Sequence, residues 1–307
     1  MSTTIQIRMG GYGPPTTAFS KALKFIGDRI EAEFADCVEI EYVYNIMDLG
    51  HHGEEILTLV ENGELTLGYQ SSSYLTDRVP ELGFVDLPFL FRDNDHARTA
   101  MDGALGRYLT KKIEERINYR ILGYFENGFR HISNKLRPVR RPEDLAGMKT
   151  RVLPSDVQAR TFQLLGATPM RMDLTEAIDG VVNGTLDAQE NPFANTVTYG
   201  VHKFHRYHTL SNHFYISRPI FTHRDSVDAW PDDLKAAMDN AVRDSITYQR
   251  RLSEREAIDA RKEIEAAGGE IVELTEDEHQ AFVDAVSPQH AEARETFGDE
   301  MFKMAGL

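Results

Sequence analysis

The chain has 307 residues, of which 41% are hydrophobic and 27% are charged, and its formal net charge at pH 7 is -15. This length suffices for two domains or for one large α/β barrel, and no run of about eighteen apolar residues is present that would cross a membrane. The acidic excess argues against nucleic-acid binding, because phosphates are bound by clustered lysine and arginine. The densest basic cluster, residues 137–141, is interrupted by proline and is interpreted as a solvated turn.

Cys37 is the only cysteine. A single thiol excludes an intramolecular disulfide, a CxxC redox pair and a zinc site made of several thiolates, but it does not identify the compartment. The N-terminal residues enter a predicted strand almost directly, and no basic region followed by an apolar region precedes that strand. Either the protein is cytosolic or a signal peptide has been removed, and composition does not distinguish the two.

Short β-rich segments alternate with helical patterns along the first part of the chain. Residues 3–10 alternate polar and apolar side chains with a period of two, as a half-buried strand does, and a helical pattern follows over 16–34. Further predicted strands are 38–45, 65–72 and 118–125, and further predicted helices are 53–63 and 94–116. This order is typical of a mostly parallel sheet.

The same alternation starts again at Gly128. The predicted strands are 128–134, 148–154, 167–172 and 185–191, and the predicted helices lie near 155–165, near 175–183 and from Pro192 onward. Residues 209–223 are a long extended run of β-branched and aromatic side chains, which is too long for one small sheet. This run is a candidate to pass between two sheets.

The C-terminal part begins with an unusually long predicted helix. Pro231 suits a first helical turn, and neither proline nor glycine recurs until Gly268. Such a helix reaches about 50 Å and is expected to brace two domains. After a short strand at 270–274, Thr275 and Glu278 form a capping box that begins the final helices.

Arg151 lies in the middle of a predicted buried strand. Pro154 ends this strand, and Ser155 or Asp156 can cap the helix that follows. Arg151 is therefore expected near the C-terminal end of a strand and beside a helix N-terminus, which are the places where open α/β sheets receive anionic ligands. The alternative is a surface arginine paired with some of the 49 acidic residues.

A glycine-rich turn at residues 10–13 carries GxG after a strand. The third glycine of a dinucleotide fingerprint is missing and two prolines follow, which argues against dinucleotide binding, and no Walker A sequence is present. The turn is interpreted as a tight strand-to-helix connection with Tyr12 over whatever binds there.

His202, His205 and His208 are spaced three residues apart, and histidines close together in sequence raise the question of a metal site. On a helix these positions drift around the face, no acidic neighbour completes a ligand set, and a solvent-facing or core-edge position is favoured. Ser71–Ser73 lack the GxSxG surroundings of a nucleophile, so ligand binding and simple turn polarity remain open for them.

The segment 187–191 places several polar side chains at a strand end. Paired carboxylates there would suit acid–base chemistry, with Glu190 as a possible base. Asn191, which stands immediately before Pro192, is better placed as an amide donor at a helix entrance, and capping alone also explains it.

Five motifs occur in an order and spacing that resembles a known family. ELGFVDLPFLF, GFRHISN, PEDLAGMKTRV, LLGATPM and GTLDAQENP are similar to segments of the DctP-type solute-binding proteins of tripartite ATP-independent periplasmic (TRAP) transporters. The resemblance covers nearly the whole chain, from GYGPPTTAFSKAL to the last helices, and several linked motifs make it specific.

The resemblance implies a set of substrate-binding residues. It implies that Arg151 is the main carboxylate-binding arginine, that Arg130 assists it, and that Asn191 contributes its amide. A pocket position that is often aromatic in the family is Leu174 here, which leaves the identity of the substrate open. Other residues in segments that line the cleft of such proteins are Tyr12, Gln70, Ser71 and Phe214.

The resemblance also implies an architecture and a role. The expected fold is an α/β clamshell like that of periplasmic binding proteins, with residues 1–126 plus about 214–252 in one domain, 127–213 plus about 253–307 in the other, and a ligand cleft between them. The expected protein is a periplasmic, monomeric receptor whose signal peptide has been removed. It closes over a small organic acid, delivers the acid to the TRAP membrane permease subunits, and uses no cofactor, metal or catalytic residue.

Two alternatives stay open at this point. The first is an enzyme on the same scaffold that acts on a small organic acid, with Glu190 or a histidine in the cleft as its base. The second is a sensor or storage protein that binds the acid without a transporter. The sequence favours the receptor, because it shows no metal set, activated nucleophile or cofactor loop.

Overall fold

A computed structural model describes residues 4–307 of the chain, and Thr3, the first residue of the first predicted strand, lies outside this range. The chain divides into two compact units. Unit 1 comprises the chain up to Ser71 together with Gly106–Glu126 and Ser217–Glu254. Unit 2 comprises Ser72–Leu105, Asn127–Ile216 and Arg255–Leu307.

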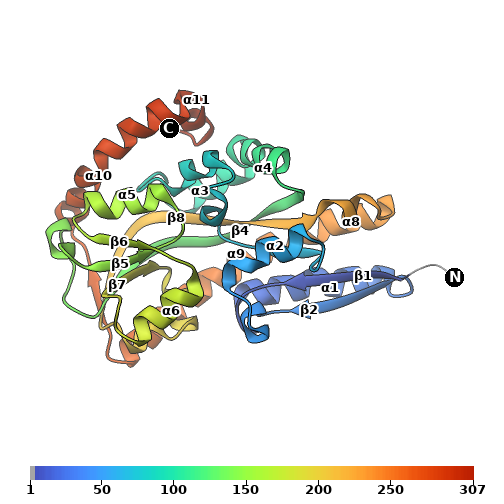
Figure 1. Ribbon diagram of the computed structural model, residues 1–307, viewed down its shortest axis with the longest axis horizontal. Helices are drawn as coiled ribbons and strands as arrows, with labels where there is room; N and C mark the ends of the chain where they lie inside the picture. Colours follow the sequence, from blue (N-terminus) through green and yellow to red (C-terminus); the bar gives the residue numbers. More distant parts are fainter. Residues whose placement is uncertain (1–3) are drawn as a thin grey trace. The chain divides into compact units, whose positions relative to one another are not determined.

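Unit 1 is an α/β unit in which a parallel three-stranded arrangement is extended by one antiparallel strand (Figure 1). The central strand β1 pairs in parallel with β2 and β3, and β3 pairs antiparallel with β8. The strands are β1 (Ile5–Gly10), β2 (Val38–Val43) and β3 (Leu67–Tyr69), with part of β8 (Tyr207–His223). The helices are α1 (Ala18–Phe34), α2 (Ile56–Glu61), α8 (Arg224–Asp228), most of α4 (Ala104–Arg116), and the 3-10 helices η1 (Ile46–Leu49) and η2 (Gly53–Glu55).

Unit 2 is also α/β. Its strand β5 pairs in parallel with β6 and β7, β7 pairs antiparallel with β4, and β9 pairs in parallel with β8. The strands are β5 (Lys149–Val152), β6 (Thr168–Arg171), β7 (Ala188–Asn191) and β9 (Glu270–Glu273). The helices are α3 (Asn94–Asp102), α5 (Asp156–Leu164), α6 (Leu174–Val182), α7 (Phe193–Thr198), α10 (Glu276–Phe297) and α11 (Asp299–Met304), with the 3-10 helices η3 (Ser72–Leu75), η4 (Pro80–Asp86), η5 (Pro142–Leu145) and η6 (Val201–Lys203).

Three long elements contribute residues to both units: β4 (Tyr119–Asn134), β8 and α9 (Asp232–Ala266). The predicted long helix is therefore confirmed, since α9 has 35 residues and spans about 50 Å at 1.5 Å per residue. The predicted extended run at 209–223 lies within β8. Each unit thus shares continuous backbone with the other through two strands and one helix.

Local capping signals in the sequence are confirmed by the structure. The hydroxyl oxygen of Ser155 accepts a hydrogen bond from the backbone N–H of Gln158 (3.4 Å) and caps α5. Thr275 and Glu278 form the predicted reciprocal capping box at the start of α10, with bonds of 3.2 Å and 2.8 Å. These caps satisfy N–H groups that a helix leaves unpaired at its N-terminus.

Two glycines change the predicted boundaries. The segments 118–125 and 128–134 were expected as separate strands, but they form the single strand β4, in which Gly128 has a φ of 84° that other residues rarely adopt. The predicted helix over 94–116 is divided into α3 and α4 at Gly103, where a side chain would lie 2.6 Å from the carbonyl oxygen of Thr99.

Residues 72–105 belong to unit 2, although the predicted first domain includes them. The physical reason is a set of buried polar contacts. Ser73 donates a hydrogen bond to Asp86 (2.7 Å) and accepts one from the side chain of Gln158 in α5 (3.0 Å). Burial raises the pKa of Asp86 to about 6, against the hydrogen bonds from Ser155, Ser73 and Gln158 that lower it.

Candidate ligand-binding site

Arg151 lies on β5 with 2% of its surface exposed. Its Nε and one terminal nitrogen donate to the carbonyl oxygen of Met172 (3.2 Å and 3.1 Å), and that terminal nitrogen also donates to the hydroxyl of Tyr74 (3.2 Å). Both acceptors are neutral. Within residues 4–307, Arg151 forms no ion pair with a carboxylate, so the alternative of a surface ion pair is wrong.

Strand β7 places Gln189 and Asn191 on the same face of the sheet as Arg151. Arg151 is the partner of Gln189 in the parallel β5–β7 pairing, and side chains two residues apart on a strand share a face. The amide of Asn191 donates to the side-chain oxygen of Gln189 (3.1 Å), whose own amide donates to Ser133 (3.3 Å). All four residues are buried, so the predicted amide at the strand end belongs to a connected polar group.

Arg130 has a different environment. It lies on β4 and forms a buried ion pair with Glu190 of β7, in which the guanidinium donates to both carboxylate oxygens and to the backbone oxygen of Glu190 (2.7 Å). Glu190 follows Gln189 on β7, so its side chain points to the face opposite to that of Gln189 and Arg151. Glu190 is the partner of Ile132 on β4, and Arg130, two residues before Ile132, shares that face. Among the described residues, one terminal nitrogen of Arg130 makes no hydrogen bond.

Glu190 is held as a carboxylate. Burial raises its pKa, but the charge of Arg130 and the nearby His213 outweigh burial, so the pKa lies below its usual range. The Nε2 atom of His213 is 3.7 Å from a Glu190 oxygen, and burial lowers the pKa of His213. A carboxylate with a lowered pKa and a bidentate counter-ion is a poor proton acceptor, which argues against Glu190 as a catalytic base.

The predicted residues of unit 1 are buried at the ends of β1 and β3. Tyr12 forms an isolated backbone bridge with Asn45, and its ring lies 5.3 Å from that of Tyr69. The side-chain amide of Gln70 donates to the backbone oxygen of Gly53 (2.8 Å), and its oxygen accepts from the backbone N–H of Ser71 (2.8 Å). Gln70 thereby fixes the backbone that leaves β3.

The two apolar residues of the predicted site differ in position. Leu174 is the first residue of α6 and is 8% exposed. Phe214 is 1% exposed and belongs to the hydrophobic core of unit 2, where its ring packs against those of Phe162 and His213. The structure thus gives Phe214 a packing contact in the core.

The three spaced histidines are buried rather than solvent-facing. Nδ1 of His205 is 3.0 Å from the hydroxyl of Ser133, and Nε2 of His208 is 2.9 Å from the backbone oxygen of His205. Burial lowers the pKa of His205 to about 3 and that of His208 to about 4. Over residues 4–307, no group of three His, Cys, Asp or Glu side chains is arranged to hold a metal ion.

Sequence reasoning missed one buried arginine. Arg218 lies on β8 within unit 1, is 4% exposed, and its guanidinium is over the ring of Phe19 at 4.0 Å and that of Tyr12 at 5.0 Å. The signal that singled out Arg151, an arginine within an apolar extended run, is also present in YISRPIF. Nothing in the local sequence around Tyr74 or Met172 indicates that these residues are the neutral partners of Arg151.

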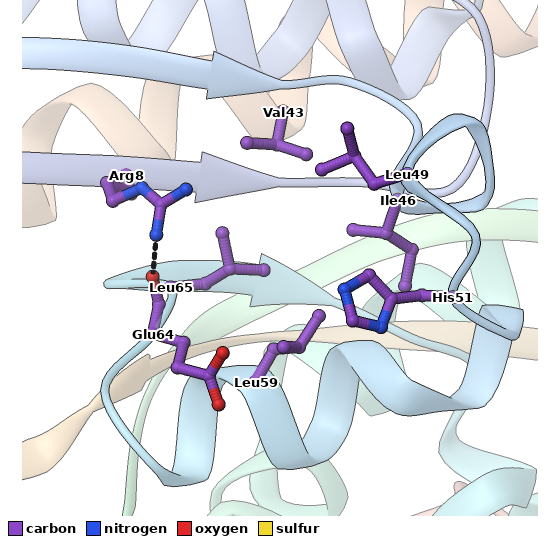
Figure 2. Close-up of a pocket in the computed structure, with 8 residues that line it drawn as sticks. All are labelled: Arg8, Val43, Ile46, Leu49, His51, Leu59, Glu64 and Leu65. Atoms are coloured by element: carbon purple, nitrogen blue, oxygen red, sulfur yellow. Dashed lines mark hydrogen bonds between the residues drawn. The ribbon is translucent and has the colours of Figure 1, made fainter.

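Unit 1 also contains a small pocket that lies apart from these residues (Figure 2). The side chains of Leu49, Leu59 and Leu65 converge there, while Arg8 donates a hydrogen bond to the backbone oxygen of Glu64 (2.7 Å). None of the eight predicted substrate-binding residues lines this pocket, whose lining combines apolar side chains with Arg8, His51 and Glu64.

Two α/β units that share three elements, together with buried Arg151 and Arg218, which have no acidic partner within residues 4–307, are features suited to a protein that binds small anionic molecules. In the described part of the chain, no helix is long and apolar enough to cross a membrane. The chain belongs to the family of bacterial extracellular solute-binding proteins, family 7 (DctP), whose model matches residues 9–296.

Individual relatives agree with this assignment. The C4-dicarboxylate-binding periplasmic protein DctP of Rhodobacter capsulatus is 26% identical over 301 residues, which are 98% of this chain and 90% of that protein. A TRAP periplasmic solute-binding protein from Polaromonas sp. JS666, bound to D-erythronate, has a TM-score of 0.92 and 26% identity, with 98% of each chain covered. A counterpart from Sulfurospirillum deleyianum with bound succinate has a TM-score of 0.92 and 26% identity, with 99% of each covered.

These findings confirm the resemblance, the two-domain α/β fold class and the role as a solute-binding receptor of the TRAP type. The relatives are binding proteins, so the function of this chain is binding rather than catalysis. The particular residues predicted for the site stay a prediction.

We expect Glu190→Gln to lower the free energy of unfolding by about 3 kcal/mol or more, because it leaves the buried Arg130 without its counter-charge. Glu292→Gln is the matched control. Glu292 pairs with Arg160 on the exposed surface of the same unit, where an ion pair contributes about 1 kcal/mol or less. Urea denaturation of both variants at pH 7 measures the difference, and equal losses would contradict the structural role of Glu190.

We expect acidification from pH 7 to pH 5 to destabilise the protein through its buried histidines. The pKa of His205 is lowered to about 3, so the unfolded chain binds the proton near pH 6.5 while the folded protein does not, and stability falls as the pH drops below about 6.5. His205→Asn should reduce the loss at pH 5 by about 2 kcal/mol. Denaturation of wild type and His205→Asn at both pH values tests this, and an equal loss in the two proteins would contradict the role of His205.

Proposed function

We propose that this chain is the extracytoplasmic receptor of a TRAP transporter and that it binds a small organic acid through Arg151. The observation that carries the proposal is a guanidinium that is 2% exposed and has only neutral partners among the described residues. Removing such a charge from water is unfavourable unless a counter-charge arrives. A carboxylate on the ligand supplies that charge.

The geometry of arginine suits this role. The contacts with Met172 and Tyr74 use Nε and one terminal nitrogen, and the other terminal nitrogen makes no hydrogen bond within residues 4–307. The two neutral contacts hold the plane of the guanidinium. The terminal nitrogen without a hydrogen bond has two N–H groups for a carboxylate. If the ligand displaces the hydroxyl of Tyr74, the other terminal nitrogen gains a free N–H as well, and two parallel hydrogen bonds can then fix the orientation of the ligand.

The ligand class follows from the relatives as well as from Arg151. Their names and bound ligands include C4-dicarboxylates, D-erythronate and succinate, and each of these carries a carboxylate. We assign the same class, small organic acids, to this chain. In this proposal Asn191, Tyr12, Gln70, Ser71 and Leu174 are further ligand contacts, while Arg130 and Phe214 support the fold of unit 2.

The same proposal assigns a compartment and partners. A receptor of this family works in the periplasm and passes its ligand to the TRAP permease subunits in the membrane. We propose that this chain does so as a monomer, without inserting into the membrane itself and without nucleic acid, metal or cofactor as a partner.

We expect Arg151→Lys to lower the affinity for the bound acid by about thirty-fold to a thousand-fold, equivalent to about 2–4 kcal/mol. Lysine keeps the charge but loses the planar pair of donors, and its ammonium is more strongly hydrated. Calorimetry measures the affinities, using whichever acid in a panel that includes succinate and D-erythronate raises the melting temperature most.

Arg171→Lys provides the control for this substitution. Arg171 lies on the neighbouring strand β6, is partly exposed and pairs with Asp156 and Asp77, so its replacement should leave ligand affinity within about threefold of wild type. Arg151→Lys binding within the same range would rule out the carboxylate clamp.

We also expect the ligand to change the arrangement of the two units, with β4, β8 and α9 as the shared elements that absorb the change. Solution scattering at saturating ligand should give a smaller radius of gyration than scattering without ligand. Superimposable profiles under the two conditions would count against the clamshell mechanism.

A further inference from the structure

Asp86 is a fully buried acid of unit 2 that pairs with no cation within residues 4–307. It is the last residue of η4, and its side chain is buried from solvent. Its Oδ1 accepts a hydrogen bond from the hydroxyl of Ser73 (2.7 Å), while its Oδ2 makes none in the described part of the chain. A buried carboxylate without a counter-ion is unfavourable by itself. The contact with Ser73 connects this carboxylate to Arg151.

A chain of hydrogen bonds leads from Asp86 to the end of β5. Ser73 donates to Asp86, and the oxygen of Ser73 accepts from the side-chain amide of Gln158 (3.0 Å). The side-chain oxygen of Gln158 accepts from the backbone N–H of Leu153 (3.3 Å), which stands two residues after Arg151. All of these residues are buried. Two side chains therefore link the carboxylate to the backbone that carries Arg151.

The same hydrogen bonds fix the turn that carries Tyr74. Ser73 and Tyr74 are consecutive residues of η3, and the hydroxyl of Tyr74 accepts a hydrogen bond from Arg151 (3.2 Å). Thr76, directly after η3, donates to the backbone oxygen of Pro154 (3.2 Å). The end of β5 is thus bound to this turn on both sides of Tyr74, and the contacts of Ser73 depend on Asp86.

The direction of these hydrogen bonds requires the ionised form of Asp86. A carboxylate only accepts, so the hydroxyl of Ser73 donates to it and leaves the Ser73 oxygen for Gln158. A proton on Oδ1 would compete with the Ser73 hydroxyl for the same contact. A proton on Oδ2 would be a buried donor without an acceptor within residues 4–307, which is unfavourable.

The charges around Asp86 do not hold it in the ionised form. Burial, and to a smaller extent the charge of Glu190 on β7, raise its pKa to about 6 against the hydrogen bonds that lower it. On β8, His213 lies 3.7 Å from Glu190, and burial lowers the pKa of His213. On α10, Nε2 of His290 is 2.6 Å from the backbone oxygen of Pro88. Other charged side chains of α5 and α10, which pack against η4, pair at the surface: Asp156 with Arg171, Arg160 with Glu292 and Arg294 with Asp299.

We propose that Asp86 is a positioning residue for Arg151, and that its ionised carboxylate, acting through Ser73 and Gln158, sets the ligand affinity of the site. This inference rests on the proposed function, in which Arg151 binds the carboxylate of the ligand. Loss of the charge on Asp86 loosens η3 and the end of β5, and a site that must be ordered again on binding has a lower affinity. Binding and ionisation are then coupled, so the bound ligand in turn stabilises the ionised form.

The first measurement needs no ligand. The Nε–H of Arg151 is buried and donates to the backbone oxygen of Met172 (3.2 Å), so its NMR resonance can be observed and assigned by its absence in Arg151→Lys. In wild type this resonance should shift between pH 8 and pH 5 with a midpoint at about 6. It should not titrate in Asp86→Asn. The exposed acid of α5 supplies the control, Asp156→Asn, which should titrate as wild type does. A wild-type resonance that stays fixed over this range would overturn the inference.

The second measurement is the pH dependence of affinity by calorimetry. The probe is D-erythronate or galactonate, whichever binds more tightly, because the single carboxylate of each stays ionised in this range. Wild-type affinity should fall about tenfold from pH 8 to pH 5, as expected when binding requires the ionised form of a group whose pKa is about 6. Asp86→Asn should bind about tenfold more weakly than wild type at pH 8 and show a flat profile.

A further variant keeps the acid and interrupts the hydrogen-bond chain. Ser73→Ala leaves Asp86 in place but removes its link to Gln158, so ligand affinity should lose its pH dependence as in Asp86→Asn. This variant decides the question if Asp86→Asn does not fold. A tenfold pH dependence retained by Ser73→Ala would overturn the role of the chain through Ser73.

The outcomes separate this inference from the proposed function. If an acid binds wild type equally well at pH 5 and pH 8, while Asp86→Asn lowers only the free energy of unfolding, Asp86 has a purely structural role and the receptor of an organic acid still stands. If neither probe nor succinate raises the melting temperature, the proposed function fails, and the Arg151 resonance alone decides whether Asp86 positions this arginine.

Discussion

A guanidinium that is removed from water must meet an acceptor or a counter-charge, and this requirement organises both units of the protein. Arg130 meets it through Glu190 and Arg224 through backbone carbonyls. These arginines are satisfied by the fold itself. Within residues 4–307, Arg151 has only neutral hydrogen-bond partners and the guanidinium of Arg218 contacts only aromatic rings, so neither charge is balanced by an acid of the described chain.

The side chains of β7 point alternately to the two faces of the sheet, so Arg130 and Arg151 meet different residues of this strand. Because successive side chains on a strand point to opposite faces, Glu190 faces Arg130 while Gln189 and Asn191 share a face with Arg151. A shift of one residue in the register of β7 would exchange these faces and direct the carboxylate toward Arg151. The register of one short strand therefore decides which arginine is paired with Glu190.

Local sequence predicted what depends on local physics. The strand and cap around Arg151, the 35-residue helix α9 and the capping box at Thr275 follow from hydrophobic period, helix formers and short-range hydrogen bonds, and the structure confirms them. The helix break at Gly103 and the continuation of β4 through Gly128 were harder to predict, because a glycine permits a turn, a bend within a strand or a helix break.

The partners of the arginines were beyond local reasoning. Glu190 is 60 residues from Arg130, and Tyr74 is 77 residues from Arg151, so only the pairing of distant strands brings them together. Arg218 carried the same local signal as Arg151 and was missed because its aromatic cage comes from Tyr12, Phe19 and Tyr69, about two hundred and about one hundred and fifty residues away. The composition of a segment marks an arginine as buried, but its charge balance is a property of the folded chain.

Charge balance also explains how a protein with net charge -15 can bind an anion. Exposed charges are screened over about 8 Å at physiological ionic strength, so the surface acids repel an incoming acid only weakly at the distance of a buried site. Buried pairs escape most of that screening and interact more strongly than exposed ones. The long-range field of the protein therefore lowers the rate of encounter more than it lowers the final affinity, which in our proposal depends on the guanidinium of Arg151, a group with no acidic partner within residues 4–307.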